Sequence, residues 1–306
     1  MKRLAERARV RGAVRRFFDA RGFLEVDTPA MVPSPGLDVH LDAFEVAGGE
    51  GGAPRWLSTS PEYQMKRLLA AGHERIYQIA PCFRRGERGE RHNPEFTMVE
   101  WYRAHAGVED VMRDTEQLVA AVTGGAVRLE AGGRTVDLAP PLDRMTVCEA
   151  FARYVGWSRE ATLAAAEADE DRYFRALVED VEPALAARDR GVFLVDFPAT
   201  QASLARTKPG DPAVAERFEL YVAGVELCNG FGELVDAAEQ RQRLTRDQGA
   251  RRARGLPVYP IDERFLEALA RVPPSGGNAL GFDRLVALMC GATAIADALA
   301  FTADEL

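Results

Sequence analysis

The stretch RHNPEFTMVEWYRAH, residues 91–105, decides how the rest of the chain is interpreted. From residue 96 onward it alternates as a half-buried β-strand does, so one face would carry Phe96, Met98, Glu100 and Tyr102. The residues between them would face the other way. A carboxylate inside an apolar row is unusual, because burying an unpaired charge is costly. Glu100 therefore needs an explanation beyond core packing.

This strand is preceded by a basic loop and by another strand. RIYQIAPCF, residues 75–83, has strand composition, so the two strands and the loop 84–94 predict a long hairpin. The loop holds two glycines and five basic residues, Arg84, Arg85, Arg88, Arg91 and His92. Arginine binds polyphosphate well because its N–H donors form a rigid fork, and glycine allows close backbone approach. The alternative is an ordinary solvated loop.

A second hairpin, ERFELYVAGVELCNG, begins at Glu216 and carries a pair of glutamates. A two-residue turn at 223–224 would place Tyr221 opposite Glu226, and Glu219 opposite Cys228. These four side chains would share one face, with both carboxylates within reach of one cation. Mg²⁺, bound also by substrate phosphates, is the predicted occupant. The alternative is the solvated outer face of an edge hairpin.

A third candidate segment, GGNALGFDR at residues 276–284, is a glycine-rich turn and short strand that lead into a helix. It is not a dinucleotide fingerprint, because no βαβ unit of that type surrounds it. Arg284 stands where the strand meets the helix, which suits a second phosphate-binding arginine.

The bulk properties set the class of protein. The 306 residues, 47% of them hydrophobic, suffice for one large α+β domain or two modest ones. The sequence shows no clean linker, although GGEGGAP around residues 48–54 predicts a flexible turn. We therefore expect a single domain, 1–306, with a mainly helical insertion around 108–190, where alanine-rich stretches favour helix.

Charge, cysteine content and hydropathy narrow the function. With 39 basic and 47 acidic residues, a net charge of −8, the chain is a poor candidate for general nucleic-acid binding. The four cysteines are far apart, which predicts reduced, mostly buried thiols. No apolar run approaches the ~20 residues of a membrane helix. The arginine-rich N-terminus is interpreted as an amphipathic helix ending near Gly22, rather than as a transit peptide.

Together, the order and content of these segments resemble the class II aminoacyl-tRNA synthetases. The three motifs of that family match the N-terminal helix and strand ending at Pro29, Phe83-Arg84 with His92–Phe96, and Gly281–Arg284. The lysyl branch is the most similar, through TSPEYQMKRLLAAG, RHNPEFTMVEWY and GVELCNGFGELVDA. The resemblance implies an α+β fold with an antiparallel sheet flanked by helices.

One part of the lysyl pattern is missing. Lysyl-tRNA synthetases carry an N-terminal OB-fold domain that reads the anticodon, and here the first motif begins within the first few residues. A free-standing core of this kind is similar to the elongation factor P–lysine ligases, which attach (R)-β-lysine to a lysine of elongation factor P. DFPATQASLA supports this likeness. It implies a cytoplasmic homodimer that uses ATP and Mg²⁺, without anticodon contacts.

The resemblance also assigns site residues by position. Arg84 would bind the α-phosphate, Arg284 the triphosphate and His92 the distal phosphates, with Phe96 stacked on adenine. The full ATP site would comprise Arg84, Glu87, His92, Asn93, Phe96, Glu226, Leu227, Gly281 and Arg284, with Mg²⁺ on Glu219 and Glu226. The lysine-like substrate would contact Ser60, Pro61, Glu62, Glu100, Tyr102, Asn229, Glu233 and Ala279.

Two departures from the family pattern matter. Arg84-Arg85-Gly86 replaces the usual Arg-Asn-Glu, so Glu87 would be the adenine-contacting acid. Ala279 replaces a glycine, and its methyl goes with a β-amino substrate in this family. One methyl contributes only ~1 kcal/mol to selection. Three alternatives stay open: a truncated synthetase that charges tRNA, a non-catalytic synthetase-like regulator, and an amide synthetase that uses ammonia or an amine.

Overall fold

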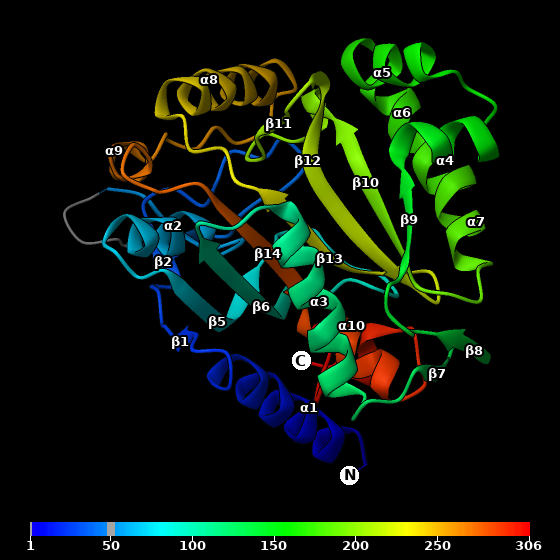
Figure 1. Cartoon of the computed structure of the whole chain (residues 1–306). Coiled ribbons are helices and arrows are strands. Elements are labelled where there is room, and N and C mark those ends of the chain that lie inside the picture. Colours follow the sequence, from blue (N-terminus) through cyan, green and yellow to red (C-terminus); the bar gives the residue numbers. More distant parts are fainter. Residues whose placement is uncertain (1, 48–52) are drawn as a thin grey trace.

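The computed structural model of the chain describes residues 2–47 and 53–306, so part of the predicted glycine-rich turn lies outside the described residues (Figure 1). The helices are α1 (Lys2–Asp19), α2 (Glu62–Ala70), α3 (Val108–Val122), α4 (Val147–Tyr154), α5 (Arg159–Ala168), α6 (Glu170–Ala176), α7 (Glu182–Ala186), α8 (Ala237–Ala253), α9 (Glu263–Leu269) and α10 (Phe282–Met289). A π-helical turn, η2 (Leu177–Val181), joins α6 to α7, and short 3₁₀ turns are η3 (Ala199–Gln201) and η4 (Ile295–Asp297).

The strands form one large sheet and two small ones. They are β1 (Leu24–Glu25), β2 (Met31–Val32), β3 (Glu45–Val46), β4 (Arg55–Leu57), β5 (Arg75–Phe83), β6 (Glu95–Ala104), β7 (Arg128–Ala131), β8 (Arg134–Asp137), β9 (Asp143–Thr146), β10 (Val192–Pro198), β11 (Thr207–Lys208), β12 (Asp211–Val222), β13 (Val225–Gly232) and β14 (Ser275–Gly281). The large sheet has nine strands in the order β1-β5-β6-β14-β13-β12-β10-β9, with β11 beside β12. Its central pairs are antiparallel. This confirms the predicted α+β fold with a sheet flanked by helices.

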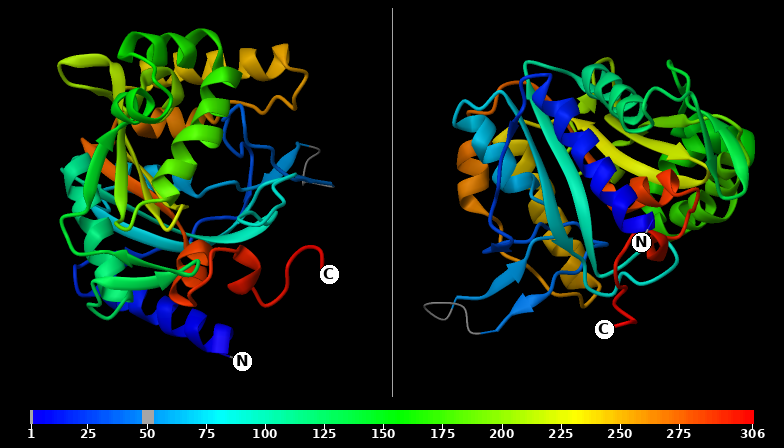
Figure 2. Two further views of the ribbon diagram at one scale, coloured as in Figure 1. Left: turned by 90° about the vertical axis from the view of Figure 1, so that its right-hand side faces the viewer. Right: turned by 90° about the horizontal axis from the view of Figure 1, so that it is seen from below.

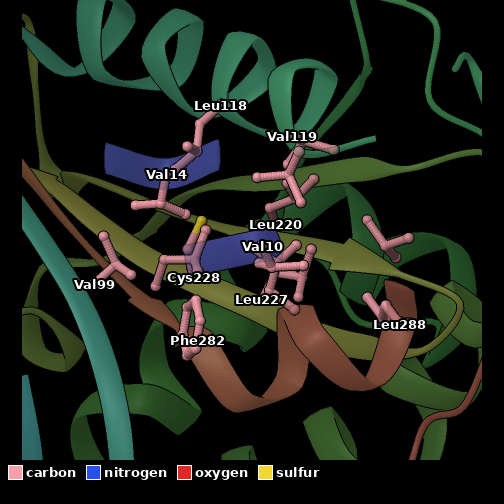
Figure 3. Close-up of a cluster of buried hydrophobic side chains, with 14 of the residues drawn as sticks. Val10, Val14, Val99, Leu118, Val119, Leu220, Leu227, Cys228, Phe282 and Leu288 are labelled. Carbon is pink, nitrogen blue, oxygen red and sulfur yellow. The ribbon is translucent and has the colours of Figure 1, made fainter. Parts of the chain in front are cut away.

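One face of the sheet packs against α1, α3 and α10 (Figure 3). Val10 and Val14 of α1, Leu118 of α3 and Phe282 of α10 meet strand residues such as Leu220 in one buried cluster. Full burial of each such side chain contributes about 1.5–3 kcal/mol, so this layer anchors the sheet.

The other face of the sheet carries α2, α8 and α9 (Figure 2). Tyr63 of α2 stacks on Phe265 of α9 with ring centroids 4.1 Å apart. The alternation in β6 divides these layers as predicted: Val99 and Trp101 enter the first cluster, whereas Tyr102 enters the second. The apolar row with the carboxylate therefore faces away from the main core.

The segment 108–190 contains five α-helices and also three strands. β7 and β8 form a separate hairpin, and β9 joins the large sheet by parallel pairing with β10. A short strand of mixed polarity such as DRMT has no hydrophobic period that distinguishes it from a loop. Pairing with a neighbouring strand stabilises it, and the sequence of the segment alone does not show this pairing. The extent of the helical insertion and the single domain stay predictions.

Two other expectations concern the whole chain. All four cysteines are free, and Cys82, Cys148 and Cys228 are buried while Cys290 is partly so, which confirms the predicted thiols. Among the described residues, no helix combines the length and the apolar character required to cross a membrane.

Candidate active site

The floor of the candidate site is a polar row that runs across the large sheet. Glu100 on β6 pairs with Ala279 on β14, Ala279 pairs with Asn229 on β13, and Asn229 pairs with Glu219 on β12. Cross-strand partners lie on the same face of a sheet. Strands far apart in sequence thus bring four predicted site residues into one line.

The β12–β13 hairpin has a different register from the one predicted. Its two-residue turn has positive φ at Ala223 (51°) and Gly224 (76°), and Tyr221 pairs with Glu226 as expected. An irregularity then shifts the pairing by one residue, so Glu219 lies opposite Asn229. The prediction that Glu219 lies opposite Cys228 and shares its face is wrong. A β-bulge reverses the alternation, and Cys228 packs in the main core.

The end of the site that was predicted to bind phosphate, called the phosphate end below, is built by the loop between β5 and β6 and by the start of α10. Arg84 lies 5.0 Å above the ring of Phe96, and its Nη1 is 3.5 Å from Glu87. Arg85 and Arg88 point elsewhere, because they pair with Asp42 and Asp304. The site encloses a cavity, described below. Of the five basic residues in the loop, Arg84, Arg91 and His92 line this cavity, whereas Arg85 and Arg88 do not.

Arg284 ties three segments together at this end. Its Nη1 donates to the backbone oxygen of Glu226 at 2.9 Å and lies 3.2 Å from the Glu226 carboxylate. Its Nη2 is 2.9 Å from Nε2 of His92. Burial and the charge of Arg284 lower the pKa of His92. The imidazole is therefore neutral at physiological pH, with Nε2 as the acceptor.

The end that was predicted to bind the amino acid, called the amino-acid end below, is buried behind Ser60. The Ser60 hydroxyl donates to Glu100 at 2.8 Å, and the Tyr102 hydroxyl donates to the same carboxylate at 2.5 Å. Burial, with the charge of Glu62, raises the pKa of Glu100 to about 8, although both hydrogen bonds oppose the shift. The ring of Tyr102 lies where a Cβ on Gly277 would be, at 2.3 Å, so this close approach requires glycine.

A buried lysine holds two further carboxylates of this end. Nζ of Lys66 is 2.5 Å from Glu62 and 2.6 Å from Glu233, and its side chain is fully buried. Burial alone would lower the pKa of Lys66, but the attraction of Glu233 and Glu62 outweighs it and raises that pKa. Burial raises the pKa of Glu233 to about 7 even with this partner. Lys66 therefore neutralises part of a strongly acidic pocket.

The two ends open into one cavity of about 290 Å³, close to the lower end of the range typical of small-molecule sites. Of the predicted residues, those on its wall are Ser60, Glu62, Arg84, Glu87, His92, Asn93, Phe96, Glu226, Leu227, Asn229, Ala279, Gly281 and Arg284. Those that do not reach the wall are Pro61, Glu100, Tyr102, Glu219 and Glu233. Glu100 lies behind the cavity wall and accepts a hydrogen bond from Ser60, which lines the cavity.

The sequence did not reveal several residues of this site. Lys66 follows Glu62 by four positions on α2, and this spacing places the two on one helix face, which is a usable signal. Arg217 binds Glu219 at 2.6 Å and Asn229 at 3.2 Å. Four further residues line the cavity without having been predicted: Asp38, Asp247, and Gln201 and Ser203 of the segment DFPATQASLA.

A metal ion would find a limited set of ligands here. Glu226 lines the cavity, whereas Glu219 is 94% buried and accepts hydrogen bonds from Arg217 and from Tyr221 at 2.8 Å. Within residues 2–47 and 53–306, no three His, Cys, Asp or Glu side chains converge as a metal site by themselves. Mg²⁺ often uses only one or two carboxylates together with substrate phosphates, and the donors present fit that arrangement.

Residues 1–305 match the family described as tRNA synthetases class II (D, K and N). The chain therefore belongs to the class II tRNA synthetases. Its curated relatives include proteins named elongation factor P–(R)-β-lysine ligase. That of Enterobacter sp. (strain 638) is 45% identical over 314 residues, covering 99% of this chain and 95% of the relative. That of Erwinia tasmaniensis is 44% identical over 313 residues, with the same coverage. Within this class, the chain is thus similar over almost its whole length to relatives that carry this name.

Proposed function

We propose that this protein activates (R)-β-lysine, or lysine, with ATP and transfers it to a lysine side chain of elongation factor P. The observation that carries the proposal is the single cavity that joins the arginine clamp, Arg84 and Arg284, to the acidic pocket around Ser60 and Glu62. A ligand with a polyphosphate at one end and ammonium groups at the other complements this charge pattern. The names of the relatives support the choice of these substrates.

In the first step, the substrate carboxylate attacks the α-phosphorus of ATP, which forms an aminoacyl-adenylate and releases pyrophosphate. The nucleophile is already ionised at neutral pH, so the step needs no general base. Arg84 and Arg284 would position the phosphates and neutralise the developing charge. Neutral His92, held by Arg284, would contact the distal phosphates, and Phe96 would stack on adenine.

Mg²⁺ bound to ATP would add charge neutralisation at the phosphates. Glu226 would hold the ion from the cavity wall, together with Glu219. At Glu219 the ion would have to replace Arg217, which is 2.6 Å from that carboxylate. Glu87 would contact adenine, and Leu227, Asn93 and Gly281 would line the nucleotide site.

The amino-acid end would bind the ammonium groups. Glu62, Glu100 and Glu233 carry three potential negative charges, and Lys66 supplies one positive charge. The remaining deficit suits a substrate with two ammonium groups. Ala279 lies between Glu100 and Asn229 in the floor, so its methyl would bear directly on the position of an amino group.

In the second step, the amine of the acceptor lysine attacks the mixed anhydride, forms an amide and releases AMP. A free lysine has a pKa near ~10.4, so this amine must lose a proton on entering the site. Because the proposed acceptor is a translation factor, we expect the protein to act in the cytoplasm.

ATP–pyrophosphate exchange across lysine isomers tests the first step. We expect exchange with (R)-β-lysine or lysine and none with a neutral isostere such as norleucine. The absence of exchange with every lysine-like compound would contradict the proposal. Mass spectrometry then separates the acceptors, because modification of elongation factor P and aminoacylation of tRNA are distinct products.

We also propose a homodimer through the first motif. Three large apolar side chains of that region are about half exposed: Leu4 of α1, Leu24 of β1 and Met31 of β2. Apolar side chains that are exposed in a single chain become buried when chains associate, so these three support the proposal. Sedimentation equilibrium should give twice the chain mass, and a monomer at micromolar concentration would contradict this.

A further inference from the structure

One part of the cavity wall lies outside the residues that we propose to bind ATP and the amino acid. It consists of Asp38, from the loop after β2, Gln201 and Ser203, from the segment after β10, and Asp247 of α8. Asp38 is exposed, Gln201 and Ser203 are half-buried, and Asp247 is 93% buried. The set therefore leads from the surface into the interior of the catalytic cavity.

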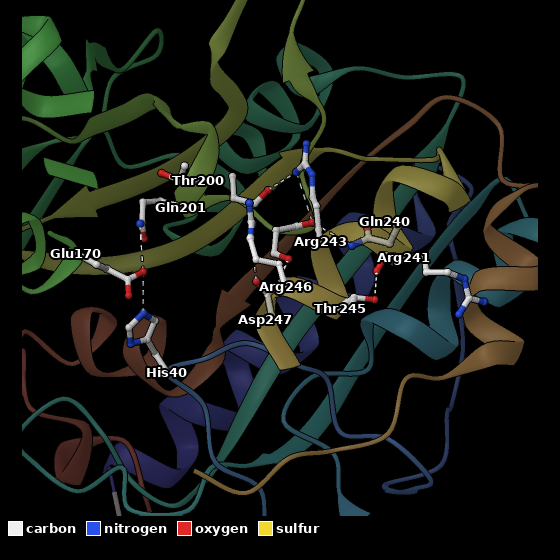
Figure 4. Close-up of polar contacts among 12 residues, drawn as sticks. His40, Glu170, Thr200, Gln201, Gln240, Arg241, Arg243, Thr245, Arg246 and Asp247 are labelled. Carbon is white, nitrogen blue, oxygen red and sulfur yellow. Dashed lines mark hydrogen bonds and ion pairs between the residues drawn. The ribbon is translucent and has the colours of Figure 1, made fainter. Parts of the chain in front are cut away.

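The segment that carries Gln201 and Ser203 is fixed from both sides (Figure 4). Arg243 of α8 donates to the backbone oxygens of Ala202 at 2.7 Å and Ala205 at 2.8 Å. Gln240 donates to the backbone oxygen of Ser203 at 3.0 Å. These bonds hold the segment against α8, next to Asp247.

Asp247 differs from most other carboxylates on the described part of the wall in the exposure of its cationic partner. Four of those carboxylates each lie within 3.5 Å of a cationic nitrogen: Glu62 with Lys66, Glu87 with Arg84, Glu226 with Arg284 and Asp283 with Arg7. The nearest cation to Asp247 is the half-exposed Arg246, at 3.6 Å. Its Oδ2 accepts a hydrogen bond from the Ser203 hydroxyl at 2.5 Å. A buried carboxylate whose charge is compensated only by a half-exposed cation is costly, and this cost favours the approach of a further cation or proton.

This wall adjoins the amino-acid end. Tyr63 lines the same cavity, one residue after Glu62. Burial raises the pKa of Tyr63, and the charges of Glu62, Asp247 and Asp38 raise it further. Asp38, Glu62 and Asp247 line the same cavity as this side chain. An amine entering past Asp38 would reach Asp247 next to the bound amino acid.

Building on the proposed function, we propose that Asp38 and Asp247 form the entry path for the acceptor lysine, and that Asp247 takes the proton from its ammonium group. Asp38 attracts the ammonium at the surface. Asp247 removes one proton, and the neutral nitrogen attacks the acyl carbon of the adenylate. The new C–N bond forms, the bond between the acyl carbon and the AMP oxygen breaks, and AMP leaves with that electron pair. The second proton of the nitrogen passes to water.

The test separates activation from transfer in Asp247→Asn, which preserves size and removes the charge. We expect ATP–pyrophosphate exchange within about threefold of the unmodified protein, and transfer to elongation factor P about 10²-fold slower, the usual contribution of a general base. Hydroxylamine is uncharged at neutral pH and needs no base, so hydroxamate formation should stay unchanged. Glu267→Gln, at an exposed carboxylate of α9, is the matched control and should change none of the three rates.

Each other outcome overturns the inference. Loss of exchange would place Asp247 in the activation step, and equal loss with hydroxylamine would place it at the adenylate. Unchanged transfer would remove it from the reaction. If Asp247→Asn lowers the unfolding midpoint, a second variant, Asp38→Asn at an exposed position, tests the entry path instead. The KM for elongation factor P should then rise severalfold with exchange unchanged, and an unchanged KM overturns the proposal. If the unmodified protein itself shows no exchange, the proposed function has failed instead.

Discussion

The two ends of the cavity differ in how their charged side chains are compensated. At the phosphate end, the side chains of Arg84 and Arg284 are 23% and 18% exposed and can exchange their present partners for a ligand. At the amino-acid end, Lys66 and Glu233 are almost wholly buried and must be compensated before any ligand arrives. The partners at the phosphate end can be exchanged for a ligand, whereas the buried ion pair at the amino-acid end also contributes to the stability of the fold.

The largest expected effect is at the phosphate end. Arg84→Ala or Arg284→Ala should lower ATP–pyrophosphate exchange by about 10³-fold, because each removes a charge that stabilises the transition state. The free energy of unfolding should change by less than ~1 kcal/mol, as is usual for partly exposed residues. Arg88→Ala, in the same loop but paired with Asp304 on the surface, is the control and should retain exchange. Retained exchange in both variants would contradict the role of Arg84 and Arg284 in binding phosphate.

At the amino-acid end, Lys66→Met should act on stability first. Removing one partner of a buried ion pair costs about 3–5 kcal/mol, because the remaining charge is left uncompensated. Urea denaturation measures this. Lys208→Met breaks a pair whose lysine is 43% exposed, and such surface pairs contribute only about 0–1 kcal/mol. Equal losses in the two variants would contradict the contrast between the ends.

The pH dependence of substrate binding is the next effect in size. Burial raises the pKa of Glu100 to about 8, so the free protein holds this carboxyl protonated at pH 7. An ammonium group favours the carboxylate, so binding should release a proton, and affinity should rise up to about tenfold per pH unit until it levels near pH 8. The same raised pKa removes stability from the free protein as pH rises toward 8. Calorimetry in buffers of different ionisation enthalpy measures the proton, and a flat profile between pH 6 and 8 would exclude this role for Glu100.

The smallest effect sharpens the specificity of the floor. Ala279→Gly removes one methyl between Glu100 and Asn229. It should shift the ratio of kcat/KM for β-lysine over α-lysine by about fivefold toward α-lysine, because one methyl contributes only ~1 kcal/mol. The KM for ATP serves as the internal reference and should not move. A shift toward β-lysine would reverse the assignment.

Sequence reasoning succeeded where a local period or a motif carries the information. The alternation of residues 96–103 separates Trp101 from Tyr102 as the structure does, and the motifs bring Arg84, His92 and Arg284 to one cavity. Local rules failed at the β12–β13 bulge, because an extra residue in one strand reverses every later side chain and has no composition signal here. Cys228 consequently went to the core.

Residues brought in by tertiary packing were beyond reach. Asp247 lies on a polar helix, and only the packing of α8 against residues 199–206 shows that it faces the cavity. The strand β9 forms by pairing with β10, which no feature of DRMT predicts. The burial of Lys66 likewise follows from the meeting of α2 with Glu233 of the segment after β13. These features depend on contacts between distant segments.

We propose that both ends of the cavity serve one reaction on a protein acceptor. Mass spectrometry of elongation factor P after incubation with this protein, ATP and (R)-β-lysine tests it most directly, with tRNA present as a competing acceptor. We predict a mass increase of one lysyl group on a single lysine of elongation factor P, and uncharged tRNA. Charged tRNA with unmodified elongation factor P would contradict the account.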